Sequence, residues 1–481
     1  MKSRQYITTT LPYVNAQPHV GFAMEIIRAD ALARYYRSQN YDVFFNTGTD
    51  EHGIKVLQKA EEADLEPQKY VDPFAESFKG LIQLLHISED IHFVRTTDVR
   101  HVAAAQEFWK RCDENGFIYK KNYQSKYCVG CELEKTDSEL TDGRCDIHTN
   151  QDIELIDEEN YFFKFSACED FLKKFYTENP TFVIPDFRFN EIKNFVEGGL
   201  QDFSISRLKS KMSWGIPVPG DNDHVMYVWF DALINYISTL GWPTDLNTFE
   251  EFWSEGLPIQ YAGKDNLRQQ SAMWQAMLYA AGLPNTKQVV INGFINSGGV
   301  KMSKSLGNVI SPYDVVEKYG AEALRYYLLR HMNSFEDSDM TMEKFHEAYN
   351  ANLANGIGNL VQRLMKMIVS YEVDISDINF DHAPVSSYHS DHFEKDRDLN
   401  KVMDEIWRLV GDMDQFIAEH EPFKKIKIDK KGAHIDLHYL AGELSRLAIS
   451  LYPMMPVTAA KIQECLTEVK TPEQPLFARK D

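Results

Sequence analysis

Hydrophobic and polar positions show two different periodicities over the first 116 residues. Short apolar runs typical of buried strands cover residues 6–10 and 43–46. Apolar residues then recur at helical spacing over residues 22–37, 55–63, 68–85 and 99–115. A chain that alternates strands with helices pairs its strands in parallel through right-handed crossovers. The pattern therefore predicts the first half of a parallel α/β sheet.

The alternation stops near residue 117 and returns near residue 222. The residues between these points are polar and rich in turns. Beyond them, strand-like runs at 225–229, 259–262 and 289–292 are separated by helical patterns at 231–240 and 266–281. A doubly wound, Rossmann-type α/β sheet interrupted by an insertion is the simplest arrangement with this pattern.

Only helical patterns remain after residue 321. The four longest cover residues 345–367, 399–419, 437–452 and 457–468. Helices of this length, joined by loops and carrying apolar stripes, pack together as a bundle. We therefore expect an all-α domain to follow the α/β part.

The charge of the chain is strongly acidic but unevenly distributed. The 481 residues contain 51 Lys and Arg against 72 Asp and Glu, a net charge of −21. This argues against a protein coated with basic charge for nucleic acid or anionic lipid. Residues 132–159 hold eleven acids and two bases, so this stretch alone carries −9. Residues 423–431 have the opposite sign, with five lysines against Asp429.

Targeting segments are missing from the sequence. The first ten residues contain no apolar core of a signal peptide, and no apolar run reaches the roughly 18 residues that a membrane helix needs. Six cysteines are too few for a disulfide-stapled secreted scaffold of this length. We expect a cytoplasmic protein with no membrane contact.

Three of the cysteines and one histidine have the spacing of metal ligands. Cys128 and Cys131 form a C-x2-C pair, and Cys145 and His148 form a C-x2-H pair thirteen residues later. Two such turns brought together make a tetrahedral Cys3His set, which suits one structural zinc ion. Cys112, Cys168 and Cys465 have no partner by spacing, and we expect ordinary buried thiols there.

Two short motifs point to phosphate chemistry. His19 and Gly21 stand where the first predicted strand gives way to a helix, whose N-terminus attracts anions. Gly21 has no side chain, so a ligand can approach the backbone closely. The string KMSKS places Lys301 and Lys304 in a glycine-flanked loop. Such a loop can close over a polyphosphate and neutralise a leaving pyrophosphate.

The two motifs, in this order, resemble the signature pair of class I aminoacyl-tRNA synthetases. Four further strings narrow the resemblance to the methionyl-tRNA synthetases: TLPYVNA at 10–16, TGTDEHG at 47–53, YVWFDA at 227–232 and ALRYYL at 323–328. The resemblance covers nearly the whole chain. Its end, QPLFAR, is similar to the close of the short bacterial form.

This resemblance implies a methionine–tRNA ligase. The expected reaction is ATP-dependent activation of L-methionine to methionyl-adenylate, followed by transfer to the 3′ end of tRNA(Met). His19, Lys301 and Lys304 would stabilise the developing phosphate charge, together with Mg²⁺. Arg207 matches an active-site arginine of the family.

The resemblance also assigns the substrate contacts. Asp50 would pair with the ammonium of the amino acid, whereas Gly21, Gly263 and Asp265 belong to the ATP site together with the histidine and lysines above. Apolar and aromatic positions would enclose the methionine side chain, and two polar positions complete the pocket. These expected pocket residues are Leu11, Tyr13, Trp229, Ala232, Tyr236, Asn266 and Gln270.

The same resemblance divides the chain into five segments. A Rossmann-type catalytic domain is expected at 1–116 and 222–300, interrupted at 117–221 by a connective insertion that carries the zinc knuckle. The lysine loop and a stem-contact region would occupy 301–345, and a helical anticodon-binding domain 346–481. No appended dimerisation domain follows, so we expect a monomer.

The anticodon of tRNA is expected to contact one polarised face of the helical domain. Phe423 stands at the family's base-stacking position, and every base offers a π-face to such a ring. Lys424, Lys425 and Arg363 would face the phosphates.

Several departures from the family pattern leave two alternatives open. The first is a relative that activates an amino acid for an acceptor other than tRNA, and it is motivated by Asn266, Gln270, Phe423 and Ala418. The second is a tRNA- or protein-binding relative without catalysis. It is motivated by Phe22, which replaces the second histidine of the ATP motif.

Overall fold

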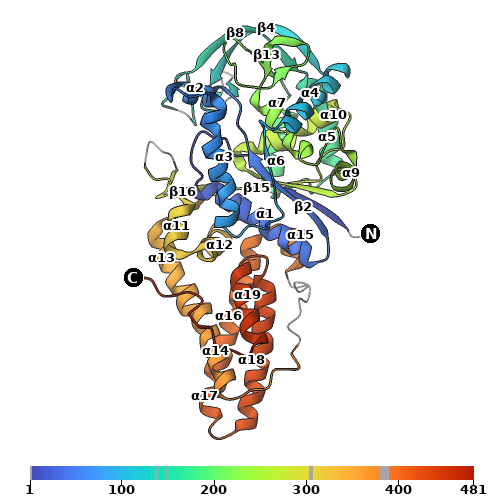
Figure 1. Cartoon of the computed structure of the whole chain (residues 1–481). Coiled ribbons are helices and arrows are strands. Elements are labelled where there is room, and N and C mark those ends of the chain that lie inside the picture. Colours follow the sequence, from blue (N-terminus) through green and yellow to red (C-terminus); the bar gives the residue numbers. More distant parts are fainter. Residues whose placement is uncertain (1–2, 132, 136–138, 148, 303–306, 379–388) are drawn as a thin grey trace.

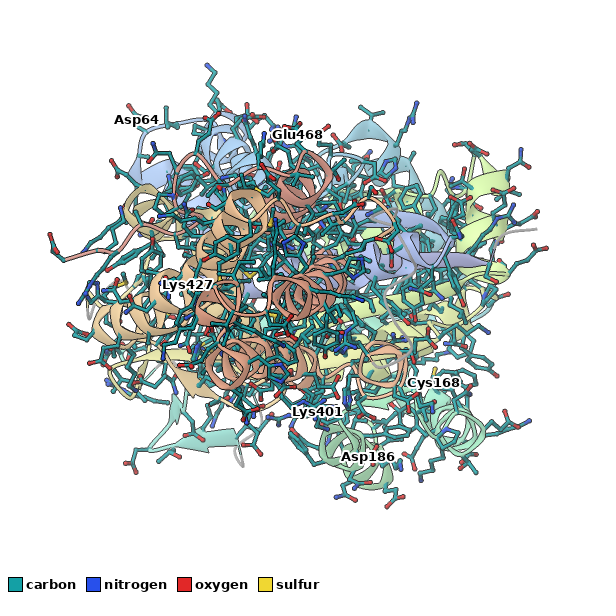
Figure 2. All side chains as sticks on the ribbon, turned by 90° about the horizontal axis from the view of Figure 1, so that it is seen from below. Asp64, Cys168, Asp186, Lys401, Lys427 and Glu468 are labelled. Atoms are coloured by element: carbon teal, nitrogen blue, oxygen red, sulfur yellow. The ribbon has the colours of Figure 1, made fainter. Side chains whose placement is uncertain are left out.

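The computed structural model describes residues 3–131, 133–135, 139–147, 149–302, 307–378 and 389–481. Two parts follow one another along the chain (Figure 1). Blue, cyan and green elements form an α/β part, and orange and red helices extend from it as a long bundle. Seen from below, the helices of the bundle stand in front of the α/β part (Figure 2).

A six-stranded parallel sheet forms the centre of the α/β part. Its strand order is β3-β2-β1-β14-β15-β9, and every neighbouring pair is parallel. The strands are β1 (Arg4–Thr8), β2 (Asp42–Thr49), β3 (His92–Arg95), β9 (Val183–Ile184), β14 (Leu257–Gly263) and β15 (Gln288–Asn292). The strand order reverses between β1 and β14, and ligands of such sheets bind at the carboxyl ends of the strands at this point. The predicted doubly wound α/β fold is confirmed.

Four helices connect the first three strands and lead into the insertion. They are α1 (Val20–Ser38), α2 (Ile54–Glu62), α3 (Pro67–Leu84) and α4 (Val99–Glu114). In α1, buried residues occur on every side, including Ile27, Arg28 and Asp30. This helix packs on the sheet and also on the helices that follow the α/β part. It is therefore enclosed from two sides, which explains why it lacks a polar face.

The predicted insertion begins as an antiparallel sheet of order β10-β8-β4-β5. These strands are β4 (Ile118–Cys128), β5 (Leu133–Lys135), β8 (Glu154–Phe163) and β10 (Phe203–Ser204), with the small pair β6 (Leu140–Thr141) and β7 (Arg144–Cys145) at the tip. The segment then forms η2 (Phe165–Cys168), α5 (Glu169–Glu178) and α6 (Asp186–Glu197). Between these last two helices, β9 pairs with β15, so the segment 117–221 also supplies the edge strand of the central sheet.

The strand expected at residues 225–229 is not part of the central sheet. Residues Asp221–Met226 form β13, which lies between β11 (Ser206–Leu208) and β12 (Pro217–Val218) in a small antiparallel sheet. Helix α7 (Val228–Ala232) begins directly afterwards. A short apolar run has the same periodicity in a buried helix as in a buried strand, which is why the sequence pattern misled here.

The rest of the α/β part consists of short helices and strands. They are α8 (Asn235–Ser238), α9 (Leu246–Phe249), η3 (Glu250–Ser254), η4 (Lys264–Asn266), η5 (Gln269–Met273), α10 (Trp274–Ala280), β16 (Ile295–Ser297), β17 (Val300–Lys301) and β18 (Ser338–Asp339). The helix expected at 266–281 is confirmed, since residues 267–280 are continuously helical. It contains η5, a π-helical turn, which is a distortion frequent at functional sites.

The C-terminal helices form the predicted bundle. They are α11 (Pro312–Tyr319), α12 (Ala321–Arg330), α13 (Met342–Ala348), η7 (Tyr349–Gly358), α14 (Asn359–Ser370), α15 (Ser390–Glu394), α16 (Leu399–His420), α17 (Pro422–Lys425), α18 (Lys430–Leu451) and α19 (Pro456–Thr467). In α14, Leu360, Leu364, Met367 and Ile368 are buried at the spacing of one helical face. Helix α17 lies at the tip of the bundle, far from the central sheet (Figure 1).

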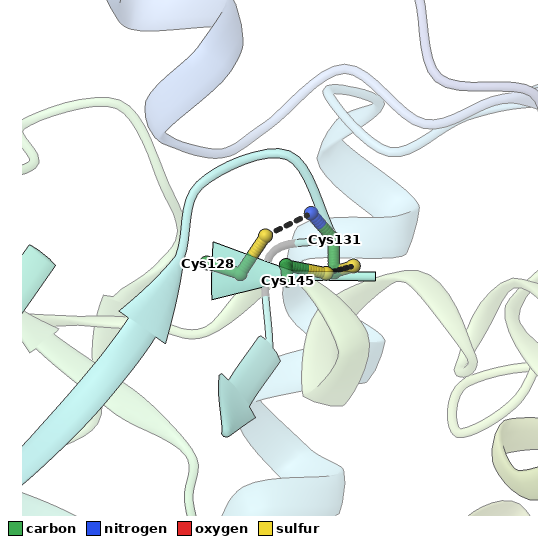
Figure 3. Close-up of side chains that lie close together, drawn as sticks. All are labelled: Cys128, Cys131 and Cys145. Atoms are coloured by element: carbon green, nitrogen blue, oxygen red, sulfur yellow. Dashed lines mark hydrogen bonds between the residues drawn. The ribbon is translucent and has the colours of Figure 1, made fainter. Parts of the chain in front are cut away.

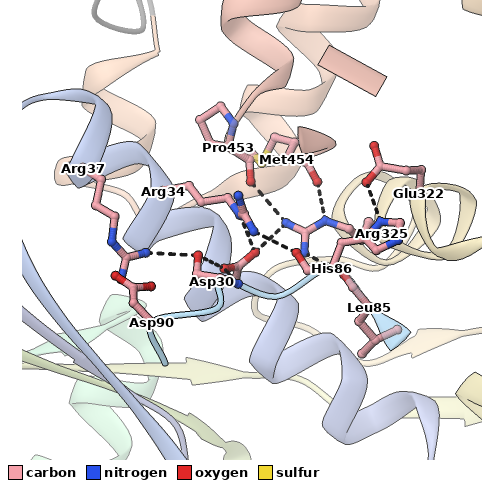
Figure 4. Close-up of polar contacts among 11 residues, drawn as sticks. Asp30, Arg34, Arg37, Leu85, His86, Asp90, Glu322, Arg325, Pro453 and Met454 are labelled. Atoms are coloured by element: carbon pink, nitrogen blue, oxygen red, sulfur yellow. Dashed lines mark hydrogen bonds and ion pairs between the residues drawn. The ribbon is translucent and has the colours of Figure 1, made fainter. Parts of the chain in front are cut away.

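A buried ion pair joins the two parts of the molecule. Asp30 of α1 and Arg325 of α12 are both fully buried, and Arg325 Nη2 lies 2.9 Å from Asp30 Oδ2 (Figure 4). Arg325 also donates to the carbonyls of Met454, at 2.7 Å, and Leu85, at 3.2 Å. Arg34 pairs with Asp30 at 2.8 Å. Although burial opposes ionisation, these two guanidiniums hold the pKa of Asp30 below its usual value.

None of the helices in the described ranges is long and apolar enough to cross a membrane.

Replacing Arg325 by Met should destabilise the fold strongly. The substitution keeps the side-chain volume but leaves the buried carboxylate of Asp30 without its main partner, a loss of about 3–5 kcal/mol. Urea denaturation followed by circular dichroism measures the change. Arg330→Met is a matched control on the same helix, because Arg330 pairs with the exposed Asp404 and such pairs contribute about 1 kcal/mol or less. Equal midpoints for Arg325→Met and the wild type would contradict this role.

Candidate functional site

His19 stands at the N-terminus of α1, beside the carboxyl end of β1. Its extended backbone starts the helix, and its Nδ1 accepts a hydrogen bond from the Gly21 N–H at 3.0 Å. Nδ1 is thus an acceptor, which leaves the proton of the neutral ring on Nε2. Partial removal from water, together with the charge of Lys301, lowers the pKa of His19. The ring is a neutral donor that opens to solvent through Nε2–H.

Gly21 is required by this geometry. A Cβ at this position would lie 2.7 Å from His19 Cε1 and 2.8 Å from Nδ1. Any side chain would therefore push the imidazole out of its capping position. The sequence predicts a glycine here because a ligand must approach the backbone closely. The close contact with the His19 ring is a second reason for a glycine at this position.

Asp265 and Lys301 lie in the same electrostatic environment as His19. Asp265 belongs to η4, directly after the end of β14, and Lys301 ends β17. Although Asp265 is exposed, partial removal from water raises the pKa of its carboxyl, and the charge of Lys301 partly offsets this effect. A Cβ at Gly263 would come within 2.8 Å of Asp265 Oδ1. The two glycines of the predicted ATP site thus leave room for its two polar side chains.

A buried carboxylate that the sequence did not reveal completes this group. Glu25 Oε1 accepts hydrogen bonds from the backbone N–H of Thr10, at 2.8 Å, and from its hydroxyl, at 2.6 Å. Burial raises the pKa of Glu25 to about 7, and the charge of Asp265 adds to the shift. Glu25 is four residues beyond Gly21, on the same side of the helix, and that spacing was the only available signal.

The expected amino-acid pocket lies at the ends of β1 and β2. Tyr13 forms an isolated parallel bridge with Asp50, and the Val14 N–H donates to the Asp50 carbonyl at 3.1 Å. Tyr13 and Trp229 pack against a small cluster that contains Tyr227 and Val228. The structure therefore brings Tyr13, Asp50 and Trp229 to one place, although they come from three distant segments.

Helices α7 and α8 supply the deeper part of the pocket. Ala232 ends α7 and Tyr236 belongs to α8, and both are buried. Gln270, in the π-helical turn η5, lies near the Tyr236 hydroxyl, whose pKa is raised mainly by burial. Among the described residues, Gln270 Oε1 and Trp229 Nε1 are buried without a hydrogen-bond partner. Buried polar atoms of this kind are normally satisfied, so a polar ligand would fit here.

The other expected pocket positions are less enclosed. Leu11 is half-buried in the loop after β1. Asn266 lies in η4, and its amide donates to Asp265 Oδ1 at 3.4 Å. Asn266 is therefore a neighbour of the carboxylate of the predicted ATP site.

Arg207 is held between two tyrosine rings. Its guanidinium carbon lies 5.0 Å from the centroid of Tyr127 and 4.7 Å from that of Tyr227. Nη1 donates to Ser204 Oγ and to the Ser206 carbonyl, both at 2.8 Å. Tyr127 precedes Cys128, so this arginine connects the small β-sheet to the tip of the insertion. The sequence predicts a role for Arg207, but no sequence signal marks the two tyrosine rings that hold its guanidinium.

Three cysteines converge at that tip (Figure 3). The sulfur atoms of Cys128, Cys131 and Cys145 all lie within 4.8 Å of one another. The Cys131 N–H donates to Cys128 Sγ at 3.4 Å, and the sulfurs of Cys131 and Cys145 are 3.4 Å apart. Three converging thiols, with an amide aimed at one of them, fit the ligand set of a structural zinc ion. The predicted fourth ligand, His148, lies outside the described residues, as does Lys304 of the lysine loop.

A groove of about 330 Å³ lies near the tip of the bundle. Its lining consists of Asn359, Gln362, Arg363, Lys366, Met367, Ser370, Tyr371 and Phe423. Arg363 Nη2 pairs with Asp414 at 2.6 Å, whereas Phe423 keeps 40 % of its surface exposed. The structure thus brings Arg363 and Phe423 together from α14 and α17, and adds Asn359 and Gln362, which carried no signal of their own in the sequence.

The two lysines after Phe423 differ in their surroundings. Lys424 is exposed, and its Nζ lies 5.9 Å from the Phe423 ring centroid and 2.5 Å from Glu421 Oε1. Lys425 pairs with the largely buried Asp436 at 2.8 Å. Lys425 therefore holds α17 against α18, while Lys424 remains open to solvent.

Comparison with known proteins defines the class first. A sequence model of the family described as tRNA synthetases class I (M) matches residues 5–152 and 130–365. The doubly wound sheet, with the His19 motif after its first strand and the lysine motif beyond its last crossover, therefore belongs to a class I aminoacyl-tRNA synthetase.

Individual relatives narrow this class. A methionine–tRNA ligase of Thermosynechococcus vestitus is 41 % identical over 468 residues, which cover 94 % of this chain and 87 % of that protein. That of Thermotoga maritima is 39 % identical over 473 residues, covering 95 % of this chain and 74 % of the relative.

A solved structure gives the same result. Mycobacterium tuberculosis methionyl-tRNA synthetase in complex with methionyl-adenylate superposes with a TM-score of 0.88 at 34 % identity, over 99 % of this chain and 95 % of that one. The chain belongs to the methionyl-tRNA synthetase family.

Glu25 should make stability depend on pH near neutrality. Its pKa is raised from an ordinary value of 4.5 to about 7 in the folded protein, so its favourable protonated state is lost as pH rises through this window. Glu25→Gln keeps the Thr10 acceptor and cannot ionise. Relative to wild type, the variant should gain about 3 kcal/mol of unfolding free energy between pH 4.5 and 8. Urea titrations across this range measure the difference, and parallel profiles would refute the shift.

Proposed function

We propose that this protein is a methionine–tRNA ligase that activates L-methionine with ATP and transfers it to tRNA(Met). The observation that carries the proposal is the meeting of His19, Asp265 and Lys301 at the reversal point of the sheet, next to the aromatic pocket of Tyr13, Trp229 and Tyr236. One group suits a triphosphate, and the other suits a thioether side chain.

The pocket positions the amino acid. Asp50 pairs with its ammonium, and the rings of Tyr13, Trp229 and Tyr236 enclose its side chain, with Leu11 and Ala232 filling the remaining space. Gln270 adds a polar contact in the deeper part of the pocket, beside the Tyr236 hydroxyl. A thioether is polarisable and packs well against aromatic rings, which favours methionine over a purely aliphatic side chain.

The first chemical step joins the carboxylate of methionine to the α-phosphorus of ATP, which enters as its Mg²⁺ complex. An oxygen–phosphorus bond forms, the bond to the bridging oxygen breaks, and pyrophosphate leaves. His19 donates through Nε2–H to a phosphate oxygen, and the ammonium groups of Lys301 and Lys304 balance the charge on the leaving group. Asp265 accepts hydrogen bonds from the ribose, and Gly21 and Gly263 leave space for the nucleotide.

The second step transfers the methionyl group. A hydroxyl of the terminal ribose of tRNA attacks the carbonyl carbon of methionyl-adenylate, AMP leaves, and the hydroxyl proton passes to phosphate or solvent. Arg207, held by Tyr127 and Tyr227, supplies positive charge beside the reacting groups. No nucleophile from the protein is required, so positioning and charge carry the catalysis.

The three cysteines, with His148 as the fourth ligand, hold one zinc ion. The ion has a structural role, since four protein ligands leave no open position for chemistry. Its ligands cross-link the turn after β4 to β7, close to Tyr127 and therefore to Arg207.

The groove at the tip of the bundle receives an anticodon base. Phe423 stacks on the base, Arg363 meets its edge or the adjoining phosphate, and Lys424 adds a phosphate contact. Lys425 supports this surface through Asp436. Helix α17, which carries Phe423, lies at the end of the bundle away from the α/β part, so an elongated tRNA would contact both ends of the molecule (Figure 1).

The remaining assignments are also part of this proposal. The protein acts as a monomer in the cytoplasm, with the catalytic domain at 1–116 and 222–300, the lysine-loop region at 301–345 and the helical domain at 346–481. The connective segment at 117–221 shares β9 with the catalytic sheet. Light scattering in solution tests the monomer.

The defining experiment measures activation and transfer separately. Wild-type protein should catalyse pyrophosphate exchange with methionine and should charge a CAU-anticodon tRNA. Phe423→Ala should keep the exchange rate and lose about fivefold to 150-fold in charging, because one stacked base contributes about 1–3 kcal/mol. Exchange without charging of any tRNA would favour an enzyme with a different acceptor, and no exchange with any amino acid would favour a binding protein.

Loss of one cysteine ligand should release the zinc ion. Cys145→Ser should bind less than 0.2 equivalents of zinc by mass spectrometry under native conditions, against about one for wild type. Cys168→Ser is the matched control, because Cys168 is buried but lies outside the cluster. Equal metal content in Cys145→Ser and wild type would contradict the assignment.

A further inference from the structure

A buried carboxylate lies directly behind the proposed amino-acid pocket. Asp231 belongs to α7, between Trp229 and Ala232, and is fully buried. Each of its carboxylate oxygens contacts a different histidine. Oδ2 lies 2.7 Å from His52 Nδ1, and Oδ1 lies 2.8 Å from His101 Nε2. Nothing in the proposed reaction uses these three residues.

The two histidines connect Asp231 to separate elements. His52 follows Asp50 by two residues, just beyond the end of β2, and His101 belongs to α4. His101 Nδ1 in turn lies 2.9 Å from Ser238 Oγ, two residues after Tyr236 in α8. The chain of contacts therefore joins the segment that carries Asp50 to the helices that carry Trp229, Ala232 and Tyr236.

The His52 end of this chain is also fixed. Its ring packs against Trp214 with the centroids 5.3 Å apart, and Trp214 Nε1 donates to the Glu51 carbonyl at 2.6 Å. The Gly53 N–H donates to the Trp214 carbonyl at 3.3 Å. The backbone on both sides of His52 is thus held, so a shift of His52 would move Asp50 as well.

Asp231 remains charged in this environment. Burial opposes ionisation, but the contacts with His52 and His101 lower the pKa of the carboxyl below its usual value. A buried carboxylate that keeps its charge needs both partners in place, because losing either one leaves an incompletely paired charge in the interior. The three side chains therefore hold their elements at one separation.

We propose that Asp231 is a positioning residue that sets the distance between the ammonium site at Asp50 and the side-chain site at Trp229, Ala232 and Tyr236, and thereby the length of amino acid that the enzyme activates. This inference rests on the proposed function of the pocket. The expected effect is on discrimination between amino acids of different side-chain length, because the elements that bind the two ends of the substrate are joined by Asp231.

The test is pyrophosphate exchange with Asp231→Asn. The amide has the shape of the carboxylate but can accept from only one histidine. The KM for methionine should rise about tenfold, while the KM for ATP and kcat stay within twofold of wild type. The ratio of kcat/KM for methionine to that for the shorter 2-aminobutyrate and the longer ethionine should fall at least threefold. Unchanged KM and unchanged ratios would overturn the proposal.

Two further variants separate positioning from general stability. His101→Gln keeps a donor near the Nε2 position, so its KM for methionine should stay near the wild-type value. His101→Leu removes the donor and should behave like Asp231→Asn. Asp30→Asn is the matched control, since Asp30 is a buried carboxylate with two cationic partners outside the pocket. If Asp30→Asn raises the KM for methionine as much as Asp231→Asn, the effect is general destabilisation and the inference fails.

Misfolding of Asp231→Asn and failure of the proposed function give results that differ from failure of the Asp231 role. If Asp231→Asn does not fold, His52→Leu replaces it, with the same expected rise in KM and the same overturning result. If wild-type protein shows no methionine-dependent exchange, the proposed function fails. If wild type exchanges and the variants keep its length discrimination, only the role of Asp231 fails.

Discussion

The ion pair between Asp30 and Arg325 fixes how the two parts of this molecule sit on each other. Both groups are fully buried, so neither can leave the other without a large cost in free energy. Asp30 belongs to the same helix that begins at His19, and Arg325 binds the carbonyl of Met454 at the base of the bundle. His19 and the bundle are therefore oriented by one helix, which sets the span between the candidate site and the groove.

This constraint also explains the charge distribution. A net charge of −21 is unfavourable for a protein that binds RNA over its whole surface. Under the proposed function, RNA contacts the molecule at only a few points, and the groove with Arg363, Lys366 and Phe423 would be one of them. Residues 132–159 alone carry −9 of the total charge. Acidic surface elsewhere then limits unspecific binding to other nucleic acids.

The sequence predicted the sheet, the bundle and the cysteine cluster because each depends on local information. Strands β1, β2, β14 and β15 are short apolar runs between helices with a clear periodicity. The C-x2-C string has the spacing of metal ligands in the sequence itself. The strand expected at 225–229 failed because its burial comes from distant elements. The π-helical turn η5 within the helix predicted at 266–281 likewise depends on packing that no local pattern records.

The candidate site shows the same limit. Motif residues such as His19, Asp50 and Trp229 could be predicted because they stand in recognisable strings, and Asp231 and His52 stand in two of these strings. His101 lies in an ordinary amphipathic helix and gave no signal, since its importance comes only from its contact with Asp231. The second layer of a site is chosen by three-dimensional neighbours, which a single sequence does not reveal.

The carboxyl groups of the candidate site differ in how readily they ionise. His19 is neutral and presents Nε2–H, partial removal from water raises the pKa of Asp265, and burial brings that of Glu25 to about 7. Asp231, by contrast, is held ionised by two histidines on the amino-acid side. Under the proposed function, a bound polyphosphate would disfavour ionisation of Glu25 still further. Binding of such a ligand would then be linked to proton uptake by the helix that also carries Asp30.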